Sequence, residues 1–254
     1  MNEISSQIVS RLEDNTGWLT ISRPENRNAI SSQMWQAIPV AMSSLHADGA
    51  RVIVIRGTGS CFASGADLAE LNAIQTYKDA HLFWNSIKET LSFVHAFEIP
   101  TIAMINGPCL GGGCLLATAC DLRFASREAI LGIPAARLGI VLDDDSVGRL
   151  TQLVGPARAL EMLFTGNHIT AEQAEFIGLV NKCVEPDQLE KLTCEIANAA
   201  SLNAFASIAE AKRSVKRAVS LNDRSGLLPQ HESVVLSSYL TSDFKNRVKA
   251  LANN

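Results

Sequence analysis

Three consecutive glycines, Gly111, Gly112 and Gly113, form the stretch of this sequence best suited to chemistry. Glycine has no side chain to shield its amide group, and it adopts backbone angles that other residues avoid. Such a turn can direct N–H groups at a developing negative charge, and a helix that begins there adds the positive end of its dipole. The turn therefore indicates an oxyanion hole. The glycines by themselves indicate equally well a strand-to-helix turn packed tightly against a core.

A run of acidic residues, Asp143, Asp144 and Asp145, is the second candidate for chemistry. A carboxylate in a pocket can act as a general acid or base, and a raised pKa there would support catalysis. The run also precedes residues 147–150, so it suits the start of a helix, where one acid caps the helix and the others meet its dipole. The pattern leaves both interpretations of Asp143 open.

Length, composition and charge limit the kinds of protein this can be. The chain has 254 residues, of which 47% are hydrophobic and 19% charged, and its mean hydropathy is +0.11. One main domain with a small appendage fits these values. The net charge of −4 and the absence of Lys or Arg runs argue against nucleic acid or an anionic membrane as a partner. Without a signal-peptide pattern or an apolar run long enough to span a bilayer, we expect a cytoplasmic location.

The cysteines and histidines do not form a metal-binding pattern. No CxxC pair and no Cys/His cluster occurs, and the five histidines are scattered. We therefore predict no metal site and interpret the cysteines as reduced thiols. The cysteines are Cys61, Cys109, Cys114, Cys120, Cys183 and Cys194.

The elements that would position these residues alternate between strand and helix, which predicts an α/β fold. The predicted strands are residues 17–22, 51–57, 100–106 and 122–125, and the predicted helices between them are residues 30–46, 77–97 and 112–119. From about Gly155 onward the pattern is mainly helical, over residues 157–165, 170–178, 186–200, 204–219 and 228–240. Thr170 followed by Gln173 is typical of a capping box, to which we assign no chemistry.

Three motifs in a fixed order carry a family resemblance. They are RPENRNAI at residues 23–30, CFASGADL at residues 61–68 and NGPCLGGGC at residues 106–114. In this order they resemble the crotonases, the enoyl-CoA hydratase/isomerase superfamily, and the resemblance runs from about residue 8 to about residue 250. It implies an α/β crotonase-like spiral of ββα units over residues 1–195. A C-terminal helical region over residues 196–254 would mediate trimerisation and close the pocket, in a homotrimer or dimer of trimers.

The resemblance also implies a substrate and a site. The backbone N–H groups of Ala66 and Gly112 match the oxyanion-hole positions that hold the carbonyl of an acyl-CoA thioester, and coenzyme A belongs to the substrate, so no separate cofactor is expected. Asp67 is expected to be the charge that starts the next helix rather than a catalytic residue. The residues expected to contact substrate or CoA are Ala63 and Ser64 near the adenine, Leu68, Leu115, Ala135, and Lys245 and Lys249 at the phosphates.

The chain departs from the hydratase pattern where that pattern has its two glutamates. Those positions hold Leu115 and Ala135, which cannot bind a proton. Asp143 instead falls on a position that some isomerases of the family use as an acid/base and an aromatic dehalogenase branch uses as a nucleophile. A single carboxylate suffices to shuttle a proton while the oxyanion hole holds the dienolate. We therefore expect an enoyl-CoA double-bond isomerase with Asp143 as its catalytic residue.

Other activities remain compatible with the same scaffold. They are hydration of an enoyl-CoA, hydrolysis or decarboxylation of an acyl-CoA, and carbon–carbon cleavage of a diketone. Dehalogenation is less favoured, because Lys88 stands where that branch has its assisting histidine. The loss of both glutamates also leaves open a non-catalytic acyl-CoA-binding subunit.

Overall fold

The computed structural model describes residues 7–220 and residue 246. The chain divides into two compact units, residues 1–201 and residues 202–254. The predicted helix at residues 228–240 and the two lysines expected at the CoA phosphates, Lys245 and Lys249, lie outside the described residues.

A mixed sheet forms the centre of the first unit. Its strands are β1 (Ile8–Glu13), β2 (Thr16–Ile21), β3 (Val52–Gly57), β4 (Thr101–Ile105), β6 (Leu122–Ser126) and β9 (Lys182–Val184). They are ordered β1-β2-β3-β4-β6-β9, and only the β1–β2 pair is antiparallel. The apolar run of β3 is buried on both faces, as expected for a parallel strand with helices on either side.

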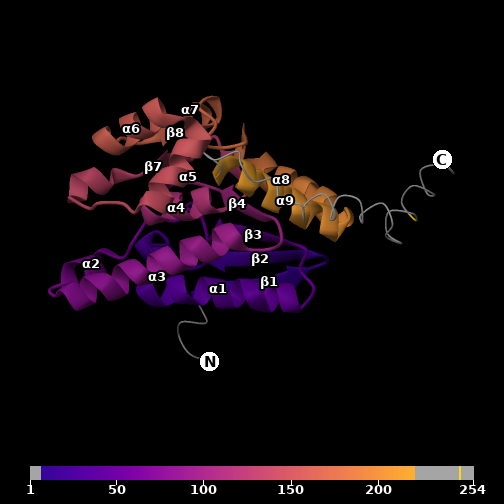
Figure 1. Ribbon diagram of the computed structural model, residues 1–254, viewed down its shortest axis with the longest axis horizontal. Coiled ribbons are helices and arrows are strands. Elements are labelled where there is room, and N and C mark those ends of the chain that lie inside the picture. The colour runs from indigo at the N-terminus through magenta and orange to yellow at the C-terminus, as the bar shows by residue number, and fades with distance from the viewer. Residues whose placement is uncertain (1–6, 221–245, 247–254) are drawn as a thin grey trace. The chain divides into compact units, whose positions relative to one another are not determined.

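Helices follow most of these strands along the chain. In the first unit they are α1 (Ser32–Ala47), α2 (Leu68–Ala73), α3 (Tyr77–Ala96), α4 (Gly112–Ala119), α5 (Asp144–Val154), α6 (Pro156–Thr165), α7 (Ala171–Phe176) and α8 (Leu189–Leu202). Short 3-10 helices occur at η2 (Pro24–Asn26), η3 (Pro134–Leu138) and η4 (Pro186–Gln188). Helices α1 and α3 run alongside each other (Figure 1). The second unit contains α9 (Phe205–Ser220).

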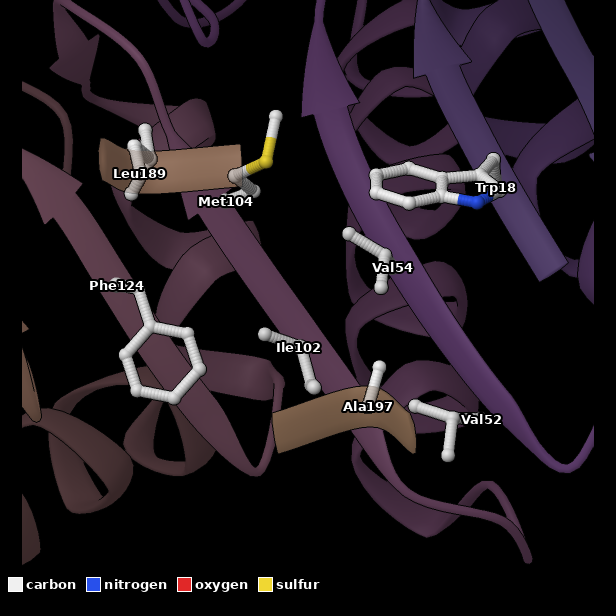
Figure 2. Close-up of a cluster of buried hydrophobic side chains, with 8 residues drawn as sticks. All are labelled: Trp18, Val52, Val54, Ile102, Met104, Phe124, Leu189 and Ala197. Carbon is white, nitrogen blue, oxygen red and sulfur yellow. The ribbon is translucent and has the colours of Figure 1, made fainter. Parts of the chain in front are cut away.

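The two faces of the sheet are covered by different helices. Figure 2 shows one face, where strand side chains such as Trp18, Val54 and Ile102 pack with Leu189 and Ala197 of α8. These strand residues alternate with residues on the opposite face, because successive side chains of a strand point to opposite sides. On that face a β-carbon at Gly17 would lie 3.1 Å from the β-carbon of Leu45, so the missing side chain lets α1 pack closely.

A small second sheet holds the glycine turn in place. Strands β5 (Cys109–Leu110), β7 (Ile130–Gly132) and β8 (Ile169–Thr170) pair in the order β5-β7-β8. The Gly111 N–H donates to the Gly132 carbonyl at 2.8 Å, and an isolated bridge joins Ala63 to Cys109. The turn is therefore fixed by backbone pairing on both sides.

The sequence predicted most of these elements. The four predicted strands are confirmed as β2, β3, β4 and β6, and α4 spans the predicted residues 112–119. The capping box at Thr170 is also confirmed. Strand β9 lies inside the part predicted to be helical, because its three residues are too short to show an alternating pattern. Across the described residues, no helix combines the length and apolar character needed to cross a bilayer.

Candidate functional site

The loop before α2 presents the backbone of Ala66. Ile30 brackets this residue in a parallel bridge: its N–H donates to the Gly65 carbonyl at 2.8 Å, and its carbonyl accepts the Asp67 N–H at 3.3 Å. The bridge uses the carbonyl of Gly65 and the N–H of Asp67, which flank Ala66. The N–H of Ala66 itself has no hydrogen-bond partner within the described part of the chain. Gly65 has φ +114°, which a residue with a side chain rarely adopts. The glycine therefore permits the bend that leaves the Ala66 amide unpaired.

The glycine turn presents a second amide at the start of α4. Gly111 has φ +51°, and the first helical hydrogen bond runs from Leu115 N–H to its carbonyl, so the N–H of Gly112 has no acceptor among the described residues. A β-carbon at Gly113 would lie 2.4 Å from the Ala63 carbonyl oxygen. The turn thus packs directly on the Ala63 backbone while it leaves the Gly112 N–H without a partner among the described residues.

The two free amides lie next to each other. A β-carbon at Gly112 would be 3.6 Å from the Ala66 nitrogen, and one at Gly65 would be 3.5 Å from the Gly112 nitrogen. Both Ala66 and Gly112 line the same cavity. Two unpaired N–H donors from adjacent segments can stabilise negative charge on one oxygen atom.

Polar contacts hold the Ala66 loop against the start of α1. Asp67 caps α2 by accepting the Ala69 N–H at 2.7 Å, and it forms an ion pair with Arg23. Glu70 accepts both the N–H and the hydroxyl of Ser32, at 2.8 and 2.7 Å. The prediction that Asp67 is a helix cap is confirmed. The hydrogen bond from Arg23 holds the pKa of Asp67 below its ordinary value, against the opposing effect of burial.

We expect Asp67→Ala to lower the free energy of unfolding by about 2 kcal/mol at neutral pH, because it removes a charged hydrogen bond and a helix cap. Since the pKa of Asp67 is lowered in the folded state, its stabilisation is complete above the unfolded value of 3.8 and is lost as pH falls through the folded value. Urea unfolding of both proteins at neutral pH and below pH 3.8 measures the difference, which should shrink in acid.

The matched control is Asp187→Ala in η4, which removes an exposed carboxylate. It should change the free energy of unfolding by less than about 0.5 kcal/mol. Equal losses in the two variants, or an Asp67 difference that is the same at both pH values, would contradict the ion-pair explanation.

The cavity beside the two amides has a volume of about 340 Å³ and predominantly apolar walls. Helix α3 contributes Ala80, Phe83, Trp84 and Ile87, and the remaining lining residues come from the Ala66 loop with α2, the glycine turn with α4, and residues 133–143. These other residues are Ser64, Gly65, Ala66, Leu68, Leu71, Ile74, Gly111, Gly112, Leu115, Ile133, Pro134, Ala135, Leu138, Ile140, Val141, Leu142 and Asp143. Among them Asp143 is the one ionisable side chain. The cavity therefore suits an apolar group with one carboxylate beside it.

Asp143 is at once the N-cap of α5 and part of the cavity wall. Its Oδ1 accepts the Ser146 N–H at 2.9 Å and its Oδ2 accepts the Ser146 hydroxyl at 2.8 Å. Burial raises the pKa of Asp143, but the two bonds from Ser146 and the charge of Arg149 outweigh it, so the net direction is downward. The raised pKa that would have supported catalysis is not found. An ionised carboxylate is instead present at neutral pH, which is the form of a base and not of an acid.

The predicted site residues are largely brought together. Ser64, Ala66, Leu68, Gly112, Leu115, Ala135 and Asp143 all line the cavity. Ala63 does not, because its N–H and carbonyl pair with Pro108 and Leu110 beneath the turn. The sequence reasoning missed the wall supplied by α3, although Phe83, Trp84 and Ile87 have the spacing of one helix face. Lys88 lies over the Trp84 ring at 4.8 Å.

The thiols near the turn are structural. All six cysteines are free, and Cys109 and Cys114 are buried next to the glycines. Burial raises the pKa of the Cys109 thiol well above its ordinary value, so it remains neutral and is a poor nucleophile. Within the described residues no group of three or more potential ligands is placed to hold a metal ion.

Comparisons with a family model and with individual known proteins point to the same family. The family model described as enoyl-CoA hydratase/isomerase matches residues 12–251. The chain is 36% identical over 211 residues to a mitochondrial protein of Arabidopsis thaliana named probable enoyl-CoA hydratase 2, covering 82% of this chain and 70% of that protein. It is 31% identical over 249 residues to the short-chain-enoyl-CoA hydratase of Clostridium acetobutylicum, covering 96% and 94%.

Solved structures with a similar fold belong to the same family. A crystal structure from Hyphomonas neptunium, described as an enoyl-CoA hydratase/isomerase family protein, superposes with a TM-score of 0.91 at 31% identity. The match covers 97% of this chain and 95% of that one. The likeness therefore extends over nearly the whole of both chains.

Proposed function

Because the chain belongs to the enoyl-CoA hydratase/isomerase family, we propose that it moves a carbon–carbon double bond within the acyl group of a CoA thioester. Membership makes it an acyl-CoA-processing enzyme and confirms the expected α/β crotonase fold with helices in the C-terminal region. The choice of isomerisation within the family rests on one observation. Among the described residues that line the cavity beside the two free amides, Asp143 is the one with an ionisable side chain.

The amides of Ala66 and Gly112 are proposed to bind the thioester carbonyl oxygen. Removal of a proton from a carbon conjugated to the thioester, directly or through an alkene, places negative charge on that oxygen. Two fixed N–H donors stabilise the resulting enolate without having to reorganise. Their position at adjoining turns, without other partners in the described structure, supports this role.

Asp143 is proposed to move the proton. In its ionised form it removes a proton from the α-carbon of a 3-enoyl thioester, and the electron pair of that C–H bond enters the conjugated dienolate. The same carboxyl group then returns the proton to the γ-carbon as the charge leaves the oxygen, which gives the 2-enoyl thioester. Proton and electrons are conserved, so one carboxylate completes the cycle without a cofactor.

Hydration of an enoyl-CoA requires different catalytic groups in the site. Adding water to an alkene requires a group that activates the water and a group that protonates carbon, and family resemblance assigns these roles to the positions of Leu115 and Ala135. Both residues line the cavity as apolar surface. Hydration remains the second candidate because the relatives from Arabidopsis and Clostridium are named as hydratases.

The cavity walls also support a substrate preference. Apolar contacts from α2, α3 and residues 138–142 favour a hydrocarbon or aromatic acyl group over one bearing charge. A second carboxylate on the acyl group would meet Asp143 in a site of low dielectric constant.

The test is incubation of the protein with 3-enoyl, 2-enoyl and dienoyl-CoA thioesters in deuterated water, followed by mass spectrometry and proton NMR. We expect a migrated double bond, deuterium in recovered substrate and product, and no hydroxyacyl product. A hydroxyacyl-CoA would establish hydration instead. Release of free CoA would indicate hydrolysis, and binding without turnover would indicate a non-catalytic acyl-CoA-binding subunit.

Assembly and location are part of the same proposal. We propose a homotrimer or a dimer of trimers formed through the C-terminal helical region, acting in the cytoplasm, where the free thiols would stay reduced. Light scattering during size-exclusion chromatography gives the assembly directly, and a monomer in solution would contradict it.

A further inference from the structure

We propose that Ser146 and Arg149 are positioning residues for Asp143: Arg149 orients the Ser146 hydroxyl, and Ser146 holds both oxygens of the carboxylate so that it faces the substrate ionised. This inference rests on the proposed function, since it assigns Asp143 the role of a base. Neither residue lines the cavity, so each acts through Asp143.

The direction of the hydrogen bonds follows from the chemistry of the groups. A guanidinium has only donors, so the Ser146 oxygen must accept the bond from Arg149 Nη2 at 3.1 Å. With that lone pair occupied, the Ser146 hydroxyl hydrogen is directed to Asp143 Oδ2 at 2.8 Å. The Ser146 N–H donates to the other oxygen, Oδ1, at 2.9 Å. Ser146 therefore fixes the plane of the Asp143 carboxylate, and Arg149 fixes the orientation of the Ser146 hydroxyl.

The surroundings of Arg149 indicate that packing alone does not account for it. The residue is 8% exposed, and its Nε is buried without a hydrogen-bond partner among the residues that the structure describes. Arg123, the other buried arginine of the described residues, has a structural arrangement: its guanidinium donates to the carbonyls of Leu179, Ala117, Cys120 and Asp121. A buried cation is costly unless it is compensated, and Arg149 is compensated mainly by the nearby carboxylates of Asp143 and Asp145.

Other charged groups near Asp143 are engaged elsewhere. Helix α4, packed on α5, carries no charged side chain, and on α6 Arg158 pairs with Glu161 at the surface. In η3, Arg137 donates to Thr165 and Asn167. On α5 itself Asp144 and Asp145 are exposed acids, and the charge of Asp145 acts on Arg149.

Across the cavity the remaining charges also have their own contacts. Glu70 of α2 is bonded to Ser32, and Lys88 of α3 lies over Trp84. His81 of the same helix stacks edge-on with Trp84. Within the described part of the chain, Arg149 is consequently the cation that acts on Asp143.

The hydrogen bonds to Asp143 make its carboxylate a weaker base but keep it in the ionised form that can accept a proton. Donors to the carboxylate stabilise its charged form, so the pKa of Asp143 falls and the base is fully ionised at neutral pH. The same donors hold the carboxylate in one orientation, so proton removal needs no side-chain rearrangement.

The experiment compares pH profiles of kcat/KM for wild type, Ser146→Ala, Arg149→Met and Arg149→Lys with the thioester that the wild type isomerises best. Ser146→Ala removes a hydrogen-bond donor to the Asp143 carboxylate and Arg149→Met removes the nearby positive charge, so the acid limb should move upward by about one pH unit in each. Arg149→Lys retains the charge and should show a smaller shift. Ser201→Ala, which removes a buried serine hydroxyl bonded within α8, is the matched control and should leave the limb in place.

A second measurement does not depend on turnover. The carboxyl infrared band of Asp143, assigned by its loss in Asp143→Asn, is titrated in each folded variant, with melting temperatures checked in parallel. Upward shifts of its midpoint in Ser146→Ala and Arg149→Met are the expected result, and unmoved midpoints in both would overturn the proposal. A wild type inactive on every thioester would refute the proposed function, whereas the titration would still decide the role of Ser146 and Arg149.

Discussion

Asp143→Asn is expected to lower kcat for double-bond migration by about 100- to 10,000-fold, the usual range for loss of a general acid–base group. The amide has the shape of the carboxylate but cannot accept the substrate proton. Asparagine is as good a helix N-cap as aspartate, so α5 should keep its start, while the loss of one charge that compensates buried Arg149 should lower the melting temperature without unfolding the protein. The substitution therefore separates the two roles that Asp143 combines.

Three quantities check this result: the turnover of the isomerised thioester, its dissociation constant and the melting temperature. Binding should change little, because Asp143 is proposed to act on the proton and the amides to hold the thioester. Asp144→Asn makes the same chemical change one residue later, at an exposed position, and should retain wild-type turnover. Full activity of Asp143→Asn would remove the residue from the mechanism.

Gly112→Ala is expected to reduce kcat/KM by about 100- to 1,000-fold, comparable to the loss of one oxyanion-hole donor. The new methyl group would lie 3.1 Å from Cζ2 of Trp35 and 3.6 Å from the Ala66 nitrogen. Trp35 is completely buried and cannot retreat, so the start of α4 must shift instead. Such a shift moves the Gly112 amide away from its position relative to Ala66.

Gly148→Ala provides the matched control, because a β-carbon there meets nothing within 4 Å. Gly148 lies inside α5, where alanine is preferred to glycine, so stability should rise by roughly 0.5–1 kcal/mol with activity kept. Steady-state kinetics and thermal unfolding of the two variants give both quantities. Wild-type activity of Gly112→Ala would contradict the expected displacement of the Gly112 amide.

The parts of the site formed by local sequence were predictable. The start of α4 at Gly112 and the cap at Asp67 follow from glycine and N-cap chemistry within a few residues, and both are confirmed. The alternation of apolar strands and amphipathic helices likewise predicted the order of the main elements. These features depend on interactions that begin and end within one turn or one strand.

What the sequence did not reveal depends on contacts between distant segments. The α3 wall of the cavity needs the packing of that helix beside the Ala66 loop, which no local pattern specifies. The downward direction of the Asp143 pKa depends on how Ser146 and Arg149 are turned, not on their presence in the sequence. Burial alone would have raised that pKa, and only the hydrogen-bond geometry decides the sign.

The negative charge that Asp143 places in an otherwise apolar cavity wall also sets a rule for inhibitor design. A CoA thioether whose acyl arm carries a small ammonium group at the depth of Asp143 would form a charge-assisted hydrogen bond with this carboxylate. An arm ending in a carboxylate would instead be repelled, whatever its size. For this cavity, the sign of a compound's charge is therefore a sharper selection criterion than the length of its hydrocarbon arm.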